Sequence, residues 1–262
     1  MKEIPSYKPS PEEIKKAENS ITENQSHESF VHENVFNAVP PEIQEELKNP
    51  ERWTDKSFVM KMLEINGLAL NYASLDLSND REVVLAAINQ NPAALEYASP
   101  ELRGDRELVI AATRKAAETY RSILWLASPE LQDDKELALI AIKAHETGGY
   151  ALSQVSPRLQ DDKDVVLAAI NQLNCAAVFR YASKRLRADR EVVLAAIEAD
   201  HENFLKVSDQ SLWGDKEIAL AAVSKNKRYL RNIELMDREL LSDPDIQAAA
   251  AQAYDIPLKG MR

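Results

Sequence analysis

The sequence predicts an all-α protein, an α-solenoid of seven to eight two-helix repeats that are each about 27 residues long. Two observations predict this fold class. An acidic helix start recurs at a nearly constant spacing, and two further columns of residues keep a fixed distance from it. The helix starts are Asp55, Asp80, Asp105, Asp134, Asp162, Asp189, Asp215 and Asp243.

The two companion columns share the register of the aspartates. Six residues before each start after the first stands a Ser or an Asp, and three residues before it stands a Leu. Three columns in one register indicate a true repeat, because chance would not keep them aligned. The columns are Ser74, Ser99, Ser128, Ser156, Ser183, Asp209 and Asp237, and Leu77, Leu102, Leu131, Leu159, Leu186, Leu212 and Leu240.

Each repeat is predicted to open with a long helix. In six of the eight repeats its Asp is followed by a basic and then an acidic residue, as in Asp80, Arg81 and Glu82, and the copies at Asp55 and Asp243 are degenerate. We expect the Asp to cap the helix and the Glu to complement the positive helix end. The next six residues, 83–88, are apolar nearly all round, which predicts a helix sandwiched between its neighbours. An Ala pair lets neighbouring backbones approach closely: Ala86–Ala87, Ala111–Ala112, Ala168–Ala169, Ala195–Ala196 and Ala221–Ala222.

A shorter second half completes each repeat. A loop, for example at Asn91 and Pro92, leads to a second helix such as residues 93–98. The Ser column then caps a short turn, which we expect to be 3₁₀, and Ser99 followed by Pro100 is a typical start for it. Because one repeat cannot bury its apolar helix alone, neighbouring repeats must stack.

The two ends of the chain differ from the array. Residues 1–40 are rich in Pro and poor in bulky apolar residues, so we expect them to be mostly disordered or loosely ordered. A short helix over 41–48 leads into an array that covers 41–242. Residues 243–262 are expected to form a capping helix and a tail, with an Ala run that packs on one side only.

The repeat resembles a helical repeat family of unknown function. The resemblance rests on Asp80-Arg81-Glu82-Val83-Val84-Leu85-Ala86-Ala87, and on Tyr97-Ala98-Ser99 with Leu102, Asp105 and Glu107. It extends over residues 55–242, and the repeats at 105–133 and 134–161 depart from it in the loop and second helix. The family occurs in effectors that intracellular bacterial pathogens inject into host cells, and in some protists. The resemblance implies a helical repeat and a host-directed role, and it implies no catalytic residues.

Composition and charge narrow the function classes. The net charge of −11 argues against wrapping nucleic acid or an anionic membrane, since both need a basic face. The six glycines form no phosphate-binding loop, and a single cysteine excludes an internal disulfide. The first residues lack the apolar stretch of a secretory signal, and no stretch of about 18 apolar residues occurs. We therefore expect a cytoplasmic protein with no membrane partner.

No residue set in the sequence is suited to catalysis, and we expect neither a cofactor nor a bound metal. The capping aspartates lie one repeat apart, about 10 Å, which is too far for shared coordination. His27 and His32 are five residues apart, which misses the spacing of a zinc helix. His145 and His201 end long helices, where a cation suits the negative helix end. Cys175 has no neighbour that would lower its pKa.

The longest repeats, 105–133 and 134–161, contain the candidate partner-binding residues. Their additional residues fall between the two helices, and neighbouring insertions in a solenoid often project from one binding face. Aromatic and Arg side chains dominate interface hot spots. The candidates are Tyr120, Arg121, Trp125, His145 and Tyr150. Alternatively, Trp125 packs in the core of the second helix and the insertions have no function.

A second candidate column lies two residues before the Ser column. Its tyrosines could line a binding face, or they could pack between adjacent second helices. The column is Tyr72, Tyr97, Leu126, Gln154 and Tyr181.

These observations predict a non-enzymatic scaffold that binds a protein partner and is a monomer when free. If the chain is a secreted effector, the partner is a host protein and the site of action is the host cytoplasm. Two alternatives are an enzyme with an unfamiliar site in a groove between repeats, and a nucleic-acid binder. The second would use basic residues that concentrate late in the chain: Arg180, Lys184, Arg185, Arg187, Arg190, Lys225, Lys227, Arg228 and Arg231.

Overall fold

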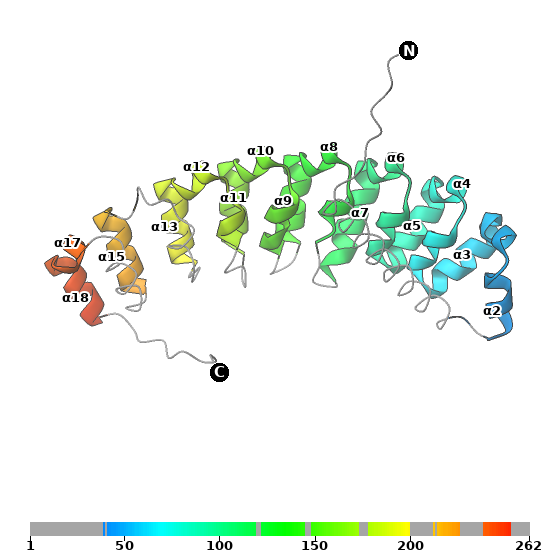
Figure 1. The fold of residues 1–262 in the computed structure, drawn as a ribbon, viewed down its shortest axis with the longest axis horizontal. Helices are drawn as coiled ribbons and strands as arrows, with labels where there is room; N and C mark the ends of the chain where they lie inside the picture. The colour runs from blue at the N-terminus through cyan, green and yellow to red at the C-terminus, as the bar shows by residue number, and fades with distance from the viewer. Residues whose placement is uncertain are drawn as a thin grey trace, which may run out of the picture. The chain divides into compact units, whose positions relative to one another are not determined.

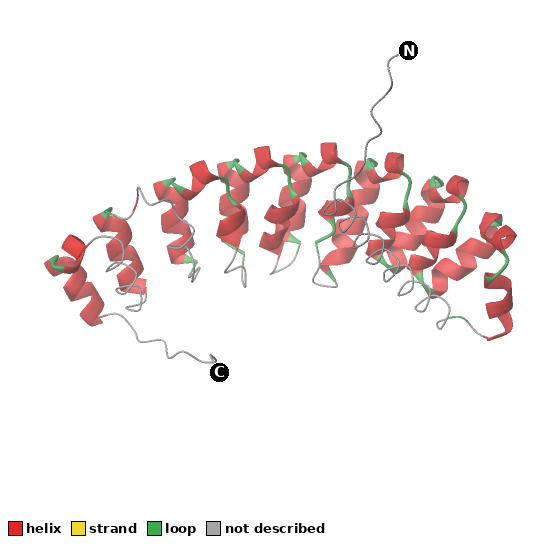
Figure 2. Ribbon diagram, in the orientation of Figure 1, coloured by secondary structure: helices red, strands yellow, loops and turns green. Residues whose placement is uncertain are grey.

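The structure is a computed structural model that describes residues 39, 41–118, 122–144, 148–172, 178–199, 212, 214–225 and 238–252. Within these ranges every regular element is a helix, and long helices alternate with short ones (Figures 1 and 2). The protein is an all-α solenoid of tandem repeats, as the sequence predicts. The chain divides into two compact parts, residues 1–99 and 100–262, which we describe separately.

The N-terminal part contains four α-helices and three 3₁₀ helices in its described residues, the latter marked η. They are α2 (Pro41–Leu47), η1 (Pro50–Thr54), α3 (Lys56–Ile65), η2 (Gly67–Tyr72), α4 (Leu75–Ser78), α5 (Arg81–Gln90) and η3 (Pro92–Tyr97).

The C-terminal part continues the same alternation. Its described elements are α6 (Pro100–Arg103), α7 (Arg106–Ala117), η4 (Leu124–Leu126), α8 (Pro129–Gln132), α9 (Lys135–Lys143), η5 (Gly148–Gln154), α10 (Pro157–Gln160), α11 (Lys163–Ile170), η6 (Val178–Tyr181), α12 (Lys184–Arg187), α13 (Arg190–Glu198), α15 (Lys216–Lys225), α17 (Arg238–Leu241) and α18 (Pro244–Gln252). The long helices α7, α9, α11 and α13 stand side by side, and the short helices α8, α10 and α12 follow one edge (Figure 1).

The long helices begin where the sequence predicts. The Asp80 carboxylate accepts from the backbone N–H groups of Glu82 (2.9 Å) and Val83 (3.3 Å). Every other described capping aspartate accepts from at least one N–H group at the start of its own helix. These bonds pair N–H groups that have no partner within the helix. The cap therefore defines where each repeat starts.

The second half of the repeat differs from the expectation in helix type. The segment after each of the long helices α3, α5, α7, α9 and α11 contains a 3₁₀ helix, and the described Ser-capped turns are α-helical. In the 3₁₀ helix η3, Asn91 caps the N–H of Ala93, and the N–H of Ala94 donates to Asn91 O (3.0 Å), three residues back. A segment of six residues gains more backbone bonds from this tighter i→i+3 pattern than from an α-helix. The turn closes instead with an i→i+4 bond, from Ser78 N to Ser74 O (2.9 Å).

Burial of the long helices is one-sided, contrary to the expected all-round burial. In α5, Val83, Val84, Ala87 and Ile88 are buried, whereas Leu85 and its neighbour Ala86 are half-buried. The same spacing is buried in the other long helices. Thus only the second Ala of each Ala pair lies in the core.

Backbone hydrogen bonds join successive repeats within each part. The N–H of each Ser-column residue donates to a carbonyl at the end of the preceding short helix, with distances of 2.9–3.0 Å. This bond fixes the register of one repeat on the next, independently of side-chain identity. The pairs are Ser74–Trp53 and Ser99–Ser78 in the N-terminal part, and Ser128–Arg103, Ser156–Gln132 and Ser183–Gln160 in the C-terminal part.

The end of the array is closed by α18. Ile246 is fully buried against Ala219 and Val223 of α15, and Ala249 and Ala250 pack beside it, half-buried. The other two alanines of the run face outward, which is the one-sided packing that the sequence predicts. The disorder expected for residues 1–40 falls outside the described residues except at Val39, which is buried and accepts a bond from Gln44.

Candidate protein-binding surface

Two of the five predicted binding residues, Trp125 and Tyr150, lie in the described part of the chain. Both are exposed, Trp125 by 56% and Tyr150 by 36% of its surface. Exposure excludes the alternative that Trp125 belongs to the core. Tyr120, Arg121 and His145 fall outside the described residues.

Trp125 faces outward because of its register in η4. It stands three residues before Ser128, and its neighbours Leu124 and Leu126 are both buried. In a 3₁₀ helix, side chains three residues apart share a face, so a short helix with two buried residues presents the residue between them to solvent. The sequence does not reveal this, because the helix type of the segment determines which residue faces out.

Tyr150 lies on the neighbouring 3₁₀ helix, η5, which packs against η4. It precedes Ser153 by one 3₁₀ turn, and Ser153 holds the position in its own repeat that Trp125 holds in η4. The Ser153 hydroxyl donates to Tyr150 O (2.8 Å). Tyr150 and Ser153 therefore lie on the same face of η5.

Gly148 brings η5 close to the preceding long helix. A Cβ atom at this position would overlap the carbonyl oxygen of Ile142 and would lie 2.8 Å from that of Ala141. Only a residue without a side chain permits this approach of two backbones. Gly148 in the insertion is thus a packing requirement.

Gln154 and Gln132 hold the backbone of η4. The Gln154 side-chain oxygen accepts from the Ser122 hydroxyl (2.8 Å) and from the Trp125 N–H (3.4 Å). The Gln132 amide donates to Trp125 O (3.3 Å) and to Ala127 O (3.0 Å). The backbone that presents Trp125 is therefore fixed from both sides, so a partner that binds it would lose little chain entropy.

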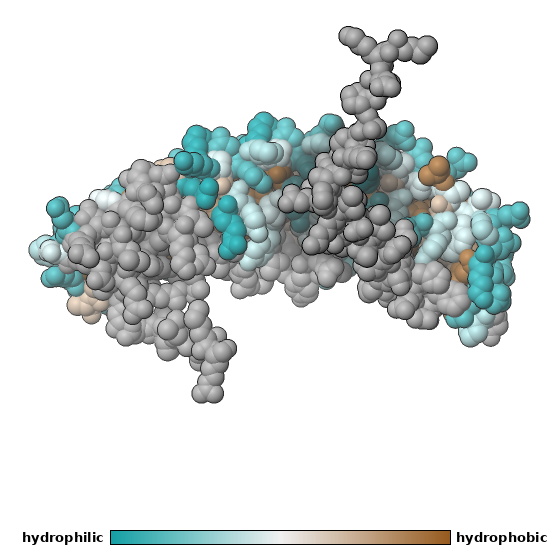
Figure 3. Space-filling model, viewed as in Figure 1, coloured by the Kyte–Doolittle hydropathy of each residue, from teal (hydrophilic) through white to brown (hydrophobic). Residues whose placement is uncertain are grey.

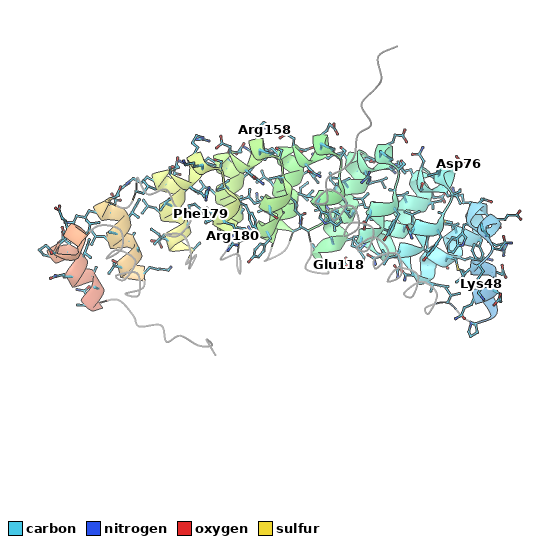
Figure 4. The ribbon with its side chains drawn as sticks, viewed as in Figure 1. Lys48, Asp76, Glu118, Arg158, Phe179 and Arg180 are labelled. Atoms are coloured by element: carbon cyan, nitrogen blue, oxygen red, sulfur yellow. The ribbon has the colours of Figure 1, made fainter. Side chains whose placement is uncertain are left out.

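Arg180 lies on the same exposed face as Trp125 and Tyr150, although the sequence indicated it only as one of the basic residues late in the chain. It stands three residues before Ser183 in η6, the position of Trp125 and Ser153 in their repeats, and it is exposed beside the buried Phe179 (Figure 4). Its guanidinium forms no ion pair or hydrogen bond with any described residue. The signal in the sequence was the column three residues before the Ser column.

The capping aspartates are held in ion pairs that connect repeats. The basic residue after one capping Asp reaches the next capping Asp and the acid two residues beyond it. Lys56, for example, bonds Asp80 (2.8 Å) and Glu82 (2.7 Å). We call these contacts the cap ion pairs. Their basic members include Lys56, Arg106, Lys135, Lys163, Arg190 and Lys216.

The cap ion pairs raise the pKa of the basic residue and lower the pKa of the capping aspartate. The hydrogen bond from Lys56 lowers the pKa of Asp80, and that from Arg106 lowers the pKa of Asp134. For Asp162, burial acts to raise the pKa, but the bonds from Lys135 and from the helix N–H groups outweigh it. These carboxylates are committed to caps and ion pairs, so they are structural groups.

A second set of ion pairs engages Arg158 and Arg185, and Arg185 is one of the basic residues that concentrate late in the chain. Asp133 accepts from Ser156 Oγ and from Arg158 Nε (2.9 Å), and Asp161 accepts from Ser183 Oγ and from Arg185 Nε (3.1 Å). The Ser and then the Arg bonds lower the pKa of both carboxyl groups. Arg158 lies on α10, at another edge of the C-terminal part from Arg180 (Figure 4).

The side chains in the column two residues before the Ser column are mainly used in packing. Tyr72 is half-buried against Trp53, with ring centroids 5.0 Å apart, and Leu126 is buried. Burial of Tyr97 raises its pKa to about 12. Gln154 is used in the contacts with η4, so this column offers fewer free side chains than the column of Trp125.

Over the described residues, no group of three or more His, Cys, Asp or Glu side chains could hold a metal ion. No helix in the same ranges is long and apolar enough to cross a membrane. The edge of the C-terminal part that carries α8, α10 and α12 is hydrophilic (Figure 3).

Comparison with known proteins gives one match. The family model described as Domain of unknown function (DUF4116) matches residues 55–103, 80–132, 134–187 and 189–241. Each match spans about two of the repeats defined above. No curated protein and no solved structure matches the chain.

Proposed function

We propose that this chain, which belongs to the family of the domain of unknown function DUF4116, is a non-catalytic scaffold that binds a partner protein through Trp125 and Tyr150. The observation that carries the proposal is the exposure of both aromatic side chains on adjacent 3₁₀ helices of the C-terminal part. Large exposed aromatic residues on a fixed backbone are typical of interface hot spots.

The repeat itself does not require aromatic residues at these positions. At the position of Trp125, other repeats have Asn71, Glu96, Ser153 and Arg180, so a polar side chain is compatible with the fold. An exposed Trp adds no core packing, and it exposes apolar surface to water. Contact with a partner protein therefore explains why a Trp stands at this exposed position.

The resemblance to repeats of injected bacterial effectors makes a host protein the first partner to test. On this proposal the chain acts in the host cytoplasm and is a monomer before it binds. The cap ion pairs support a structural scaffold, since they engage the repeated carboxylates in contacts between repeats.

The experiment compares three full-length proteins as affinity baits with eukaryotic cell lysate and quantitative mass spectrometry. The baits are the unchanged chain, the double variant Trp125→Ser with Tyr150→Ser, and the control Leu75→Ser. Leu75 is 87% exposed and lies in the N-terminal part, so the control also removes an exposed apolar side chain.

We expect a specific partner to be lost with the double variant and retained with Leu75→Ser. Circular dichroism should show unchanged helix content in all three proteins, because all three changed positions are exposed. A partner set that is the same for all three baits would contradict the proposal.

A further inference from the structure

We infer that Trp125, Tyr150, Ser153 and Arg180 form one binding row, and that the row binds an extended peptide segment with an apolar side chain and an acidic side chain. We call these four residues the 3₁₀ row. The inference rests on the proposed function and specifies the chemistry of the partner.

The register of the repeats places these residues in a line. Trp125, Ser153 and Arg180 each stand three residues before a Ser of the capping column, and each is exposed. The residue just before each of them is fully buried or nearly so: Leu124, Leu152 and Phe179. Equivalent positions in stacked repeats share one face, and η5 packs against both η4 and η6.

The length of the row fits an extended chain. Packed helices of successive repeats are about 10 Å apart, so Trp125 and Arg180, two repeats apart, are separated by about 20 Å. An extended peptide advances about 3.3 Å per residue, so about six residues span this distance. The partner should therefore carry its apolar and acidic side chains about six positions apart.

The positive charge of Arg180 in the 3₁₀ row favours a partner peptide that carries an acidic side chain. In the described 3₁₀ segments of the C-terminal part, 122–127, 148–155 and 178–182, Arg180 is the only charged residue. With no carboxylate in these segments to pair it, its guanidinium is available for a bidentate contact with a carboxylate. Trp125 on η4 supplies the apolar contact at the other end, and Tyr150 adds a second aromatic side chain on η5, between them.

Single-stranded nucleic acid is the competing occupant, because bases stack on aromatic side chains and phosphates pair with Arg. A strand of that length carries several phosphates, whereas the described 3₁₀ segments provide one cation. The chain has a net charge of −11, which also opposes a polyanion. A peptide with one acidic residue matches the single charge better.

The test measures binding of fluorescein-labelled peptides to the full-length protein by fluorescence anisotropy. Each peptide has a Gly/Ser background of about twelve residues with one Phe and one Glu, separated by about two to nine positions in either order. We expect saturable binding that is tightest near a separation of six and at least about fivefold weaker at the two extremes.

Charge reversal provides the decisive variants. Arg180→Glu should weaken binding of the best peptide at least about tenfold, and replacing the peptide Glu by Lys should restore binding to this variant. Trp125→Ser should weaken binding of both peptides. Lys184→Glu is the matched control, since Lys184 is exposed four residues further on, outside the row, and its loss should leave the affinity unchanged.

Three outcomes would overturn the inference: no saturable binding of any peptide up to about 1 mM, affinity that does not depend on the separation, or failure of the Lys peptide to rescue Arg180→Glu. Binding of an oligothymidylate that needs Arg180 and exceeds that of every peptide would assign the row to nucleic acid. If the peptides fail while the bait experiment still shows a partner that depends on Trp125, only the extended two-point mode is rejected and the scaffold function stands.

Discussion

Thr113 is the residue that departs most clearly from the core pattern of the repeat. It lies on the buried face of α7, only 3% exposed, at the position where other repeats have Ile88, Ile142, Ile170, Ile197 and Val223. Its hydroxyl has no hydrogen-bond partner among the described residues. A buried hydroxyl without a partner typically costs about 1–3 kcal/mol.

Replacing Thr113 by Val should therefore stabilise the protein. Val has nearly the same shape and removes the unpaired hydroxyl, so we expect the free energy of unfolding to rise by about 1 kcal/mol. Urea denaturation followed by circular dichroism measures it. Thr113→Ser, which keeps the hydroxyl and loses the methyl group, should be less stable than the unchanged chain. A Val variant with a lower urea midpoint would show that the hydroxyl is paired in solution.

Gly148 gives a second prediction at the scale of one residue. Gly148→Ala places a methyl group against the backbone carbonyls of Ile142 and Ala141, which cannot move independently of α9. We expect a loss of about 1–3 kcal/mol, measured as a lower melting temperature. Gly104→Ala is the comparison, because its nearest backbone atom would lie 3.2 Å away. Equal effects of the two substitutions would contradict this account of η5.

At the scale of the helix, the Ala pairs give a direct measurement of which face packs. In α13, Ala196 is fully buried and Ala195 is half-buried. Ala196→Leu should overpack the contact with adjacent helices and cost about 1–3 kcal/mol, while Ala195→Leu should cost clearly less. Thermal unfolding of both variants decides this, and the opposite order would mean that the other face of α13 is buried.

In α13 the contribution of a helix cap to the free energy of unfolding can be measured separately from that of an ion pair. Asp189 caps α13 by accepting from Glu191 N and Val192 N, and it also pairs with Lys163 (2.9 Å). Asp189→Ala removes both interactions and should cost about 1–2 kcal/mol, typical of a lost cap. Lys163→Met keeps the cap and removes only the partly exposed ion pairs with Asp189 and Glu191, so it should cost less than about 1 kcal/mol. Chemical denaturation would refute this ranking if the Lys variant were the less stable one.

For the whole molecule, the cap ion pairs predict how stability depends on pH. The pKa values of the paired aspartates are lowered from 3.8, so their contribution is complete above that value and is lost as pH falls through the lowered values. The pKa values of the paired lysines are raised from 10.5, so their contribution is complete below that value and is lost as pH rises through the raised values.

The melting temperature should therefore be flat near neutral pH and should decline in strong acid. Scanning calorimetry from about pH 7 to about pH 2 tests the acid side, where many aspartates titrate together. Asp133→Asn removes one carboxylate that Ser156 and Arg158 hold in the charged form, so this variant should show a shallower decline. A melting temperature that does not change in acid would contradict the assignment of these pKa shifts.

The sequence by itself determined the repeat, its length, the caps of the long helices and the one-sided packing of the last helix. These features depend on local signals: an Asp followed by a charged pair, a run of apolar residues and a Ser six positions before the next Asp. Each signal consists of residues close together in the sequence, so it can be recognised without knowing which repeats pack against one another.

Only the tertiary structure decided which residues face one another. It showed that the second helix is 3₁₀, that one Ala of each pair is buried, that Trp125 faces solvent and that Arg180 shares its row. It also showed that Lys135 and its equivalents reach the cap of the next repeat. The physical reason is that these features depend on packing between repeats. The cap ion pairs join residues 24 to 30 positions apart in the sequence, and the 3₁₀ row spans two repeats, so stacking is needed to bring these residues together.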